Sequence, residues 1–201
     1  MPRINDEVLR RWAALDIPVT FNNKLVAIDI GARRATVASP EGERSDIGYD
    51  FIHVVPPMRA PDAVMNSPLP WQQGGFAAGG WLEVDPGTLR HRRFANVFGL
   101  GDINGTGKGK TAATIKKSAP LVAQNLIDVI AGREPSQHFD GYTSCPLLIR
   151  EGSALLVEFD YDNRLTPSLP MIDPLQDSYF AWIMKYRLLK PAYMAVLKGR
   201  V

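Results

Sequence analysis

The chain has 201 residues, 45% of them hydrophobic, and carries a formal net charge of +2 at pH 7. This near-neutral balance argues against a protein that binds nucleic acid by neutralising phosphates. One cysteine excludes a disulfide within the chain, and three scattered histidines lack the spacing of metal ligands, so we expect no metal site. No apolar run is long enough for a spanning helix, and residues 1–6 lack the apolar core of a signal peptide.

The N-terminal part of the sequence predicts one helix and several short strands. Apolar residues at helical spacing predict a helix over residues 5–15. Three β-prone runs, at residues 25–30, 35–38 and 46–49, predict a meander. Residues 51–55, Phe-Ile-His-Val-Val, are nearly all apolar or β-branched and predict a buried parallel strand.

Residues 94–102, Phe-Ala-Asn-Val-Phe-Gly-Leu-Gly-Asp, organise the rest of the chain. Apolar residues lead into Gly-Leu-Gly-Asp, which predicts a buried strand, a tight turn and then a helix N-terminus. Gly99 and Gly101 let the backbone come close to a ligand, and Asp102 can accept hydrogen bonds from a sugar-like hydroxyl. The helix start aims N–H groups and partial positive charge at the same place. The alternative is an ordinary strand–turn–helix corner without a ligand.

A long helix is predicted after this motif. Its apolar residues keep helical spacing and Gly132 suits the position after its end, while Pro120 should kink or split it. Lys110 stands near the helix start, where a positive charge opposes the helix dipole. A ligand that carries negative charge would relieve this conflict; the alternative is a solvated lysine in a glycine-rich loop.

Cys145 lies in Gly-Tyr-Thr-Ser-Cys-Pro-Leu, outside any periodic element. Pro146 fixes the chain direction after the cysteine, which suits a thiol held at a defined place. The alternative is a small buried apolar residue. Residues 147–150 and 154–160 then predict a β-hairpin.

The C-terminal segment is apolar, aromatic and basic from Asp177 onward. Asp177 is the expected N-cap of a helix, and Pro191 should begin or kink a second one. Aromatic residues mixed with Lys and Arg are typical of an interfacial membrane helix. The alternative is a helix that packs on the core and extends its lysines to solvent.

The motif at residues 94–102, followed by Gly-Lys-Thr-Ala-Ala at 109–113, resembles the second flavin motif of two-dinucleotide-binding-domain flavoproteins. With residues 53–58, 141–147 and 155–161, the chain resembles the sulfide:quinone oxidoreductases. The resemblance implies an α/β fold, namely a partial glutathione-reductase-like flavoprotein with FAD/NAD(P)-binding Rossmann domains and a C-terminal helical membrane and quinone segment.

The same resemblance implies three regions. Residues 1–80 would be a remnant of the second, NAD-like nucleotide-binding domain and the crossover. Residues 81–135 would be the C-terminal part of the FAD-binding domain. Residues 136–201 would carry the redox cysteine and contact membrane and quinone.

The resemblance also implies a cofactor, FAD, and roles for individual residues. Cys145 would be one of two redox-active cysteines: sulfide attacks their disulfide, which leaves a persulfide and a thiolate, and electrons pass through the flavin to a quinone. By resemblance, the candidate FAD-binding residues are Gly101, Asp102, Lys110 and Thr111, those for quinone are Lys185 and Tyr186, and Lys190 would meet lipid headgroups.

Two parts of the family pattern are absent from this sequence: the Gly-x-Gly-x-x-Gly phosphate fingerprint and the partner cysteine. We therefore expect the C-terminal portion of an enzyme, inactive alone, whose partner is an N-terminal half with both features. It would self-associate through an exposed strand edge and lie peripherally on a bacterial inner membrane or its equivalent. The alternatives are a fragment of an NADH:quinone-type flavoprotein, which needs no such thiol, and a non-catalytic membrane-docking module.

Overall fold

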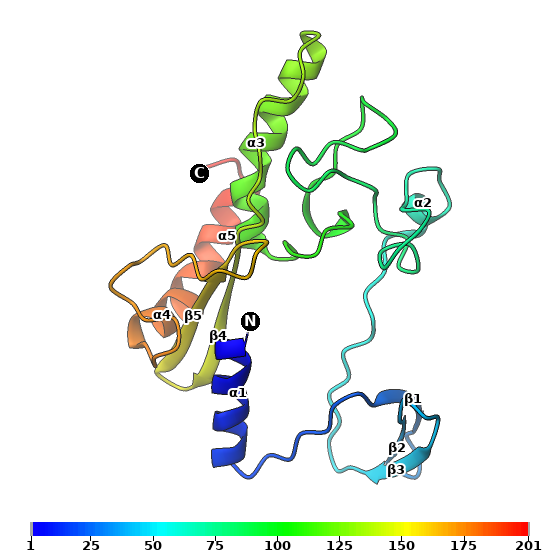
Figure 1. The fold of residues 1–201 in the computed structure, drawn as a ribbon. Coiled ribbons are helices and arrows are strands. Elements are labelled where there is room, and N and C mark those ends of the chain that lie inside the picture. The colour runs from blue at the N-terminus through cyan, green and yellow to red at the C-terminus, as the bar shows by residue number, and fades with distance from the viewer. Residues whose placement is uncertain (1, 201) are drawn as a thin grey trace. The chain divides into compact units, whose positions relative to one another are not determined.

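The computed structural model describes residues 2–200, which divide into two compact units, residues 2–57 and residues 58–200 (Figure 1). The first unit holds helix α1 (Pro2–Ala14) and strands β1 (Lys24–Asp29), β2 (Arg34–Ala38) and β3 (Arg44–Gly48). The strands form an antiparallel sheet in the order β1-β2-β3. The predicted N-terminal helix and meander are therefore confirmed.

This sheet buries little of its own surface. Among its described strand residues only Ala35 is buried. Residues 51–55 form no strand, and the side chains of Phe51 and Val55 are 85% and 78% exposed. The predicted buried parallel strand is wrong, because such a strand needs paired neighbours and covered faces, and residues 2–200 supply neither to this segment.

The second unit begins with the short helix α2 (Asp62–Met65) and a long stretch of irregular chain. The expected strand at residues 94–98 is also wrong, since only Phe98 forms a bridge, with Arg90. The 3-10 turn η1 (Gly101–Ile103) follows. The core of this region consists of four buried residues, Leu82, Val84, Leu89 and Phe139.

Helix α3 (Ala112–Ile130) begins with Thr111 as its N-cap, whose hydroxyl accepts from the Thr114 N–H. It ends in a Schellman motif, in which the N–H of Gly132 donates to Val129 and the N–H of Arg133 donates to Asp128. Gly132 has a φ of +73°, as its predicted position requires. The helix continues through Pro120, so the expected split is wrong.

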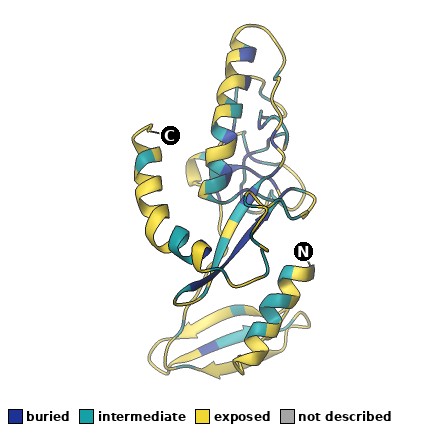
Figure 2. Ribbon diagram, turned by 90° about the vertical axis from the view of Figure 1, so that its left-hand side faces the viewer, coloured by how far each residue is buried: buried dark blue, intermediate teal, exposed yellow. Residues whose placement is uncertain are grey.

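The fully buried residues of helix α3 are all polar, although Leu121 and Val122 also pack, partly buried, against the core. These buried residues are Thr114, Ser118, Asn125 and Asp128, whereas Ile130 is 77% exposed. Figure 2 shows this helix with separate buried positions on an otherwise exposed surface. The Asn125 amide donates to the carbonyls of Thr88 (3.0 Å) and Gln137 (2.9 Å) and accepts from the Gln137 N–H (2.8 Å). Hydrogen bonds thus hold the helix against irregular chain. The backbone N–H and C=O groups of irregular chain have no partners in a helix or sheet, so they need donors and acceptors from neighbouring segments.

Strands β4 (Thr143–Arg150) and β5 (Ser153–Phe159) form the predicted hairpin, in an antiparallel sheet of their own. A helical segment follows as α4 (Tyr179–Ile183), the π-helical turn η2 (Met184–Leu188) and α5 (Leu189–Leu197). In the described chain, residues 2–200, no helix combines the length and apolar character that crossing a membrane requires.

Two details of this helical segment differ from expectation. Ser178, not Asp177, is the N-cap, and its hydroxyl accepts from the Ala181 N–H. Pro191 lies inside α5, three residues after η2. Proline lacks an N–H donor and crowds the preceding turn, which explains why the helix widens just before it rather than starting anew.

Candidate functional site

The loop between η1 and α3 (residues 104–111) is anchored by aromatic side chains from an earlier segment. The indole Nε1 of Trp71 donates to the Gly105 carbonyl at 3.0 Å. A Cβ atom at Gly105 would overlap the Trp71 ring, so this close approach requires glycine. The loop therefore enters α3 in a conformation that the protein itself determines.

Lys110 points inward and is only partly exposed. Its ammonium donates to the carbonyls of Asp102 and of Asn104 (3.3 Å) and lies 3.5 Å from the centroid of the Trp81 ring. Burial lowers its pKa, and the charge of Asp102 opposes part of that shift. The solvated alternative is wrong: Lys110 joins the turn, the loop and an aromatic ring.

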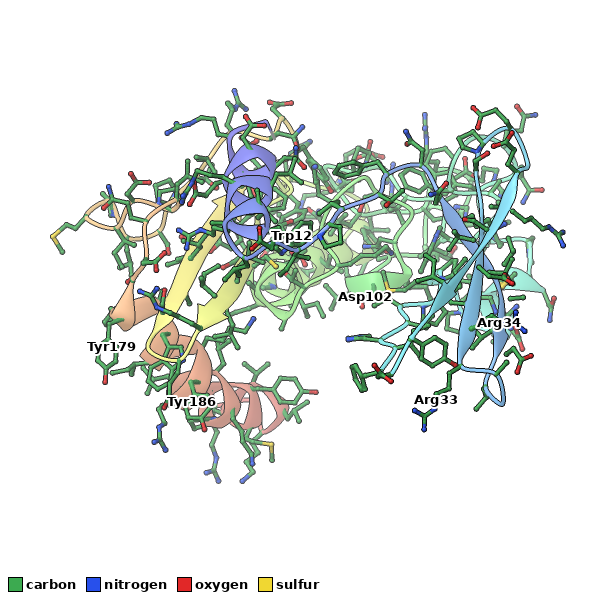
Figure 3. All side chains as sticks on the ribbon, turned by 90° about the horizontal axis from the view of Figure 1, so that it is seen from below. Trp12, Arg33, Arg34, Asp102, Tyr179 and Tyr186 are labelled. Carbon is green, nitrogen blue, oxygen red and sulfur yellow. The ribbon has the colours of Figure 1, made fainter. Side chains whose placement is uncertain are left out.

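Gly101 and Asp102 lie in η1 rather than directly before a helix. Residues 103–111 separate Asp102 from α3, so the predicted immediate helix start is wrong. The turn still packs against the first turn of α3, because a Cβ at Gly101, whose φ is +82°, would lie 3.3 Å from Ile115 Cδ1. The Asp102 side chain is exposed beside this helix start (Figure 3).

An open groove of about 340 Å³ brings the loop and the cysteine together. Its walls are Thr106, Gly107, Lys108, Gly109, Lys110 and Thr111 from the loop, with Thr143, Cys145 and Phe159 from the hairpin. Cys145 is exposed and lies in β4 opposite Val157, so its predicted place outside regular structure is wrong. Three of the sequence-predicted site residues, Cys145, Lys110 and Thr111, thus line one groove.

Lys185 and Tyr186 do not line this groove. The Lys185 ammonium donates to the carbonyl of Pro146. The Tyr186 ring stacks on Trp182 at 5.0 Å between centroids, and Trp182 stacks on Tyr179 at 5.6 Å. The exposed rings of Tyr179 and Tyr186 lie on the C-terminal helical segment, apart from Asp102 (Figure 3).

Sequence reasoning missed a buried carboxylate beside the cysteine strand. Glu158 is 2% exposed and accepts a hydrogen bond from the Tyr142 hydroxyl. It also accepts from the N–H and from the hydroxyl of Ser168, and each of these two bonds is 2.8 Å long. Burial and the bond to Glu158 raise the pKa of Tyr142 to about 12. The available signal was an acidic residue within an otherwise apolar strand.

Polar groups of η1, of the loop that follows it and of the α3 start suit part of a flavin nucleotide. Asp102 presents an exposed carboxylate, α3 presents its N-terminus, and the buried Asn104 Oδ1 has no hydrogen-bond partner among the described residues. Sugar hydroxyls and ring N–H groups could pair with such acceptors. This donor and acceptor set fits the ribityl and ring portion of FAD.

Curated proteins match this chain over most of its length. A sulfide:quinone oxidoreductase from Dictyostelium discoideum, described as mitochondrial, is 39% identical over 181 residues, which is 90% of this chain and 38% of that protein. The chain is similar to sulfide:quinone oxidoreductases. The mitochondrial enzyme of Mus musculus is 30% identical over 180 residues, which is 89% of this chain and 38% of that protein. The one of Schizosaccharomyces pombe is 31% identical over 191 residues, which is 94% of this chain and 40% of that protein.

The chain spans about two fifths of the length of these curated sulfide:quinone oxidoreductases and corresponds to their C-terminal part. The predicted resemblance to the C-terminal portion of this oxidoreductase family is thereby confirmed. No family model matches the chain.

Two solved structures share the fold. A chain of the Tetrahymena thermophila mitochondrial ATP synthase matches with a TM-score of 0.82 and 21% identity, over 96% of this chain and 46% of that one. The sulfide:quinone oxidoreductase of Aquifex aeolicus matches with a TM-score of 0.68 and 18% identity, over 96% of this chain and 44% of that one. The likeness shows that this chain shares its mixed helix and sheet fold with part of each of these chains.

Proposed function

We propose that this chain is the C-terminal part of a flavoprotein that oxidises sulfide and passes the electrons to a membrane quinone. The observation that supports it best is the groove shared by Cys145 and the loop of Lys110 and Thr111. The similarity to sulfide:quinone oxidoreductases agrees with it. In this proposal residues 1–80, 81–135 and 136–201 keep the three regional roles that the resemblance implies.

Each candidate cofactor residue has a defined task in this proposal. The Asp102 carboxylate accepts hydrogen bonds from the ribityl hydroxyls, and Gly101 permits the close approach of backbone. Lys110 and the α3 start capped by Thr111 place positive potential beside the groove. FAD, when bound, supplies a two-electron acceptor, and because the phosphate fingerprint is absent here, this chain alone would hold it weakly.

Cys145 provides the sulfur chemistry. The proposed oxidised state is a disulfide between Cys145 and a cysteine of the missing part. Hydrosulfide attacks one sulfur, the disulfide bond breaks as the new S–S bond forms, and the products are one persulfide and one thiolate. Cys145 is exposed to the groove, as such an attack requires.

The C-terminal helical segment is the proposed membrane contact. Its large exposed apolar and aromatic residues are Tyr179, Phe180, Tyr186, Leu188, Leu189, Tyr193, Met194, Val196 and Leu197, interspersed with basic residues that include Lys190. Such a surface lies in the lipid interface without crossing it. Tyr186, which presents a stacked ring, and Lys185 remain the candidate quinone residues.

The missing part is the proposed partner. Leu126, Ile127 and Ile130 on the outer side of α3 are exposed, and the relatives contain more than twice the length of this chain. A polypeptide equivalent to their remaining length would cover this apolar surface. Without it, the same surface and the free edges of the sheets favour self-association of the chain.

The test is to restore the missing part. The N-terminal portion of the Dictyostelium relative is co-expressed with this chain, and the flavin absorbance is followed after anaerobic addition of sulfide, with wild-type chain and with Cys145→Ser. We expect bleaching that requires Cys145. Bound flavin that responds to NADH but not to sulfide would contradict the proposal and favour an NADH:quinone-type flavoprotein.

A second candidate function is a non-catalytic assembly module. It is favoured by the match to a chain of a mitochondrial ATP synthase, whose TM-score of 0.82 exceeds that of the bacterial oxidoreductase. Complementation that gives a stable complex without flavin, while the chain still binds lipid vesicles, would support this function instead.

A further inference from the structure

The C-terminal helical segment is tied to both strands of the hairpin that carries Cys145. At its start, the backbones of Ser178 and Ala154 exchange two hydrogen bonds of 3.0 and 3.2 Å, which attach α4 to β5. Further along, the ammonium of Lys185 donates to the carbonyl of Pro146 in β4. Figure 1 shows α4 beside this hairpin.

The strand register places α4 on the opposite face of the hairpin from the thiol. Pro146 pairs with Leu156, and Leu156 packs with Ala181 of α4. Cys145 pairs with Val157 and lines the groove. The side chains of successive strand residues point to opposite faces of a sheet, so α4 packs on the face opposite the Cys145 side chain. The Pro146 carbonyl, which accepts from Lys185, belongs to the residue next to Cys145.

The helix geometry at this contact is unusual. Lys185 lies in the π-helical turn η2, a kind of turn that is frequent at functional sites. Lys185 is partly buried, whereas Lys190, five residues later, is exposed. The long side chain of Lys185, whose ordering costs conformational entropy, is thus held at one backbone carbonyl.

We propose that Lys185 is a positioning residue that acts through Pro146 to hold the Cys145 thiol in the groove. The role of that thiol in sulfide chemistry rests on the proposed function above, but the positioning does not. Because β4 lies at the edge of a two-stranded sheet, it has a strand partner on one side only, and the lysine supplies restraint from the helix.

The sequence contains one cysteine, so the alkylation rate of the full chain by iodoacetamide reports on Cys145 alone. We expect Lys185→Met to raise this rate about threefold and to raise amide hydrogen exchange in β4 about tenfold, as expected for loss of one charged hydrogen bond. Lys185→Arg should restore both, since Arg keeps the charge and the donor. The matched control, Lys190→Met, should change neither.

The proposal is overturned if Lys185→Met is alkylated at the wild-type rate or if Lys190→Met changes the rate equally. It is also overturned if Lys185→Arg does not restore the wild-type values. The urea midpoint of each variant is measured in parallel, and a rate increase that merely follows global stability also overturns it. If Lys185→Met does not fold, Lys185→Gln takes its place and should give an intermediate increase. These measurements need neither flavin nor sulfide, so their failure is distinguishable from failure of the sulfide assay.

Discussion

At the scale of single residues, contacts explain which predicted site residues come together. The ammonium of Lys110 donates hydrogen bonds to two backbone carbonyls and lies over the Trp81 ring. These contacts fix the loop that forms one wall of the groove. The sequence indicated Lys110 as a candidate site residue. It did not indicate the contact with Trp81, 29 positions earlier, because only folding brings the two segments together.

We expect Lys110→Met to lower the free energy of unfolding by about 1–2 kcal/mol, because it removes a partly buried cation–π contact and leaves backbone carbonyls without a donor. Urea unfolding followed by tryptophan fluorescence measures the change. Lys116→Met, at an exposed position of α3, is the control and should stay within about 0.5 kcal/mol. Equal stability of the two variants would show that the inward lysine contributes nothing.

Asp128 gives the chain a pH-dependent element of stability. The hydroxyl of Ser136 (2.6 Å) and the guanidinium of Arg133 (2.7 Å) donate to its buried carboxylate and lower its pKa from 3.8 to about 2. The unfolded chain therefore takes up the proton first. The stabilisation is complete above about pH 4 and is lost as the pH falls toward 2.

The expected result is that Asp128→Asn flattens the decline of stability between pH 4 and pH 2. Thermal unfolding across this range measures the slope. Asp6→Asn, an exposed position on α1, should leave the slope as in the wild type. A wild-type slope in Asp128→Asn would mean that other carboxylates dominate acid unfolding.

At the scale of elements, local signals placed the helices and the antiparallel strands well. The N-terminal meander, the β4–β5 hairpin and the Gly132 end of α3 follow from turn residues and periodicity, which act over a few residues. The strands expected at 51–55 and 94–98 did not form, because their burial depends on partners that residues 2–200 do not provide. Apolar composition alone does not supply such partners.

Helix α3 yields a prediction that reverses the usual rule for amphipathic helices. Asn125→Ala should destabilise the chain by about 2–4 kcal/mol, since it removes a fully buried amide and leaves two partly buried carbonyls and one N–H without this partner. Ile130→Ala, on the exposed side, should cost less than about 0.5 kcal/mol. Urea denaturation compares them. A larger loss in the isoleucine variant would show that this side is covered in solution.

At the scale of the whole molecule, the chain exposes much apolar surface at its C-terminal end (Figure 2). The triple variant Phe180→Ser, Leu188→Ser, Leu197→Ser should weaken binding to anionic phospholipid vesicles at least about tenfold, because insertion of these side chains drives interfacial binding. Vesicle co-sedimentation measures it. Met171→Ser, a fully exposed loop position, is the control, and equal binding by all forms would argue against this surface.

The sequence by itself determined the family resemblance, the candidate site residues and most of the short-range structure, because motifs, turn residues and periodicity are local properties. Tertiary structure alone decided that Cys145 shares a groove with Lys110 and Thr111, that α3 turns its polar side inward, and that Lys185 reaches Pro146. The physical reason is that each of these depends on hydrogen bonds and packing between segments far apart in the chain, whose partners no local pattern specifies.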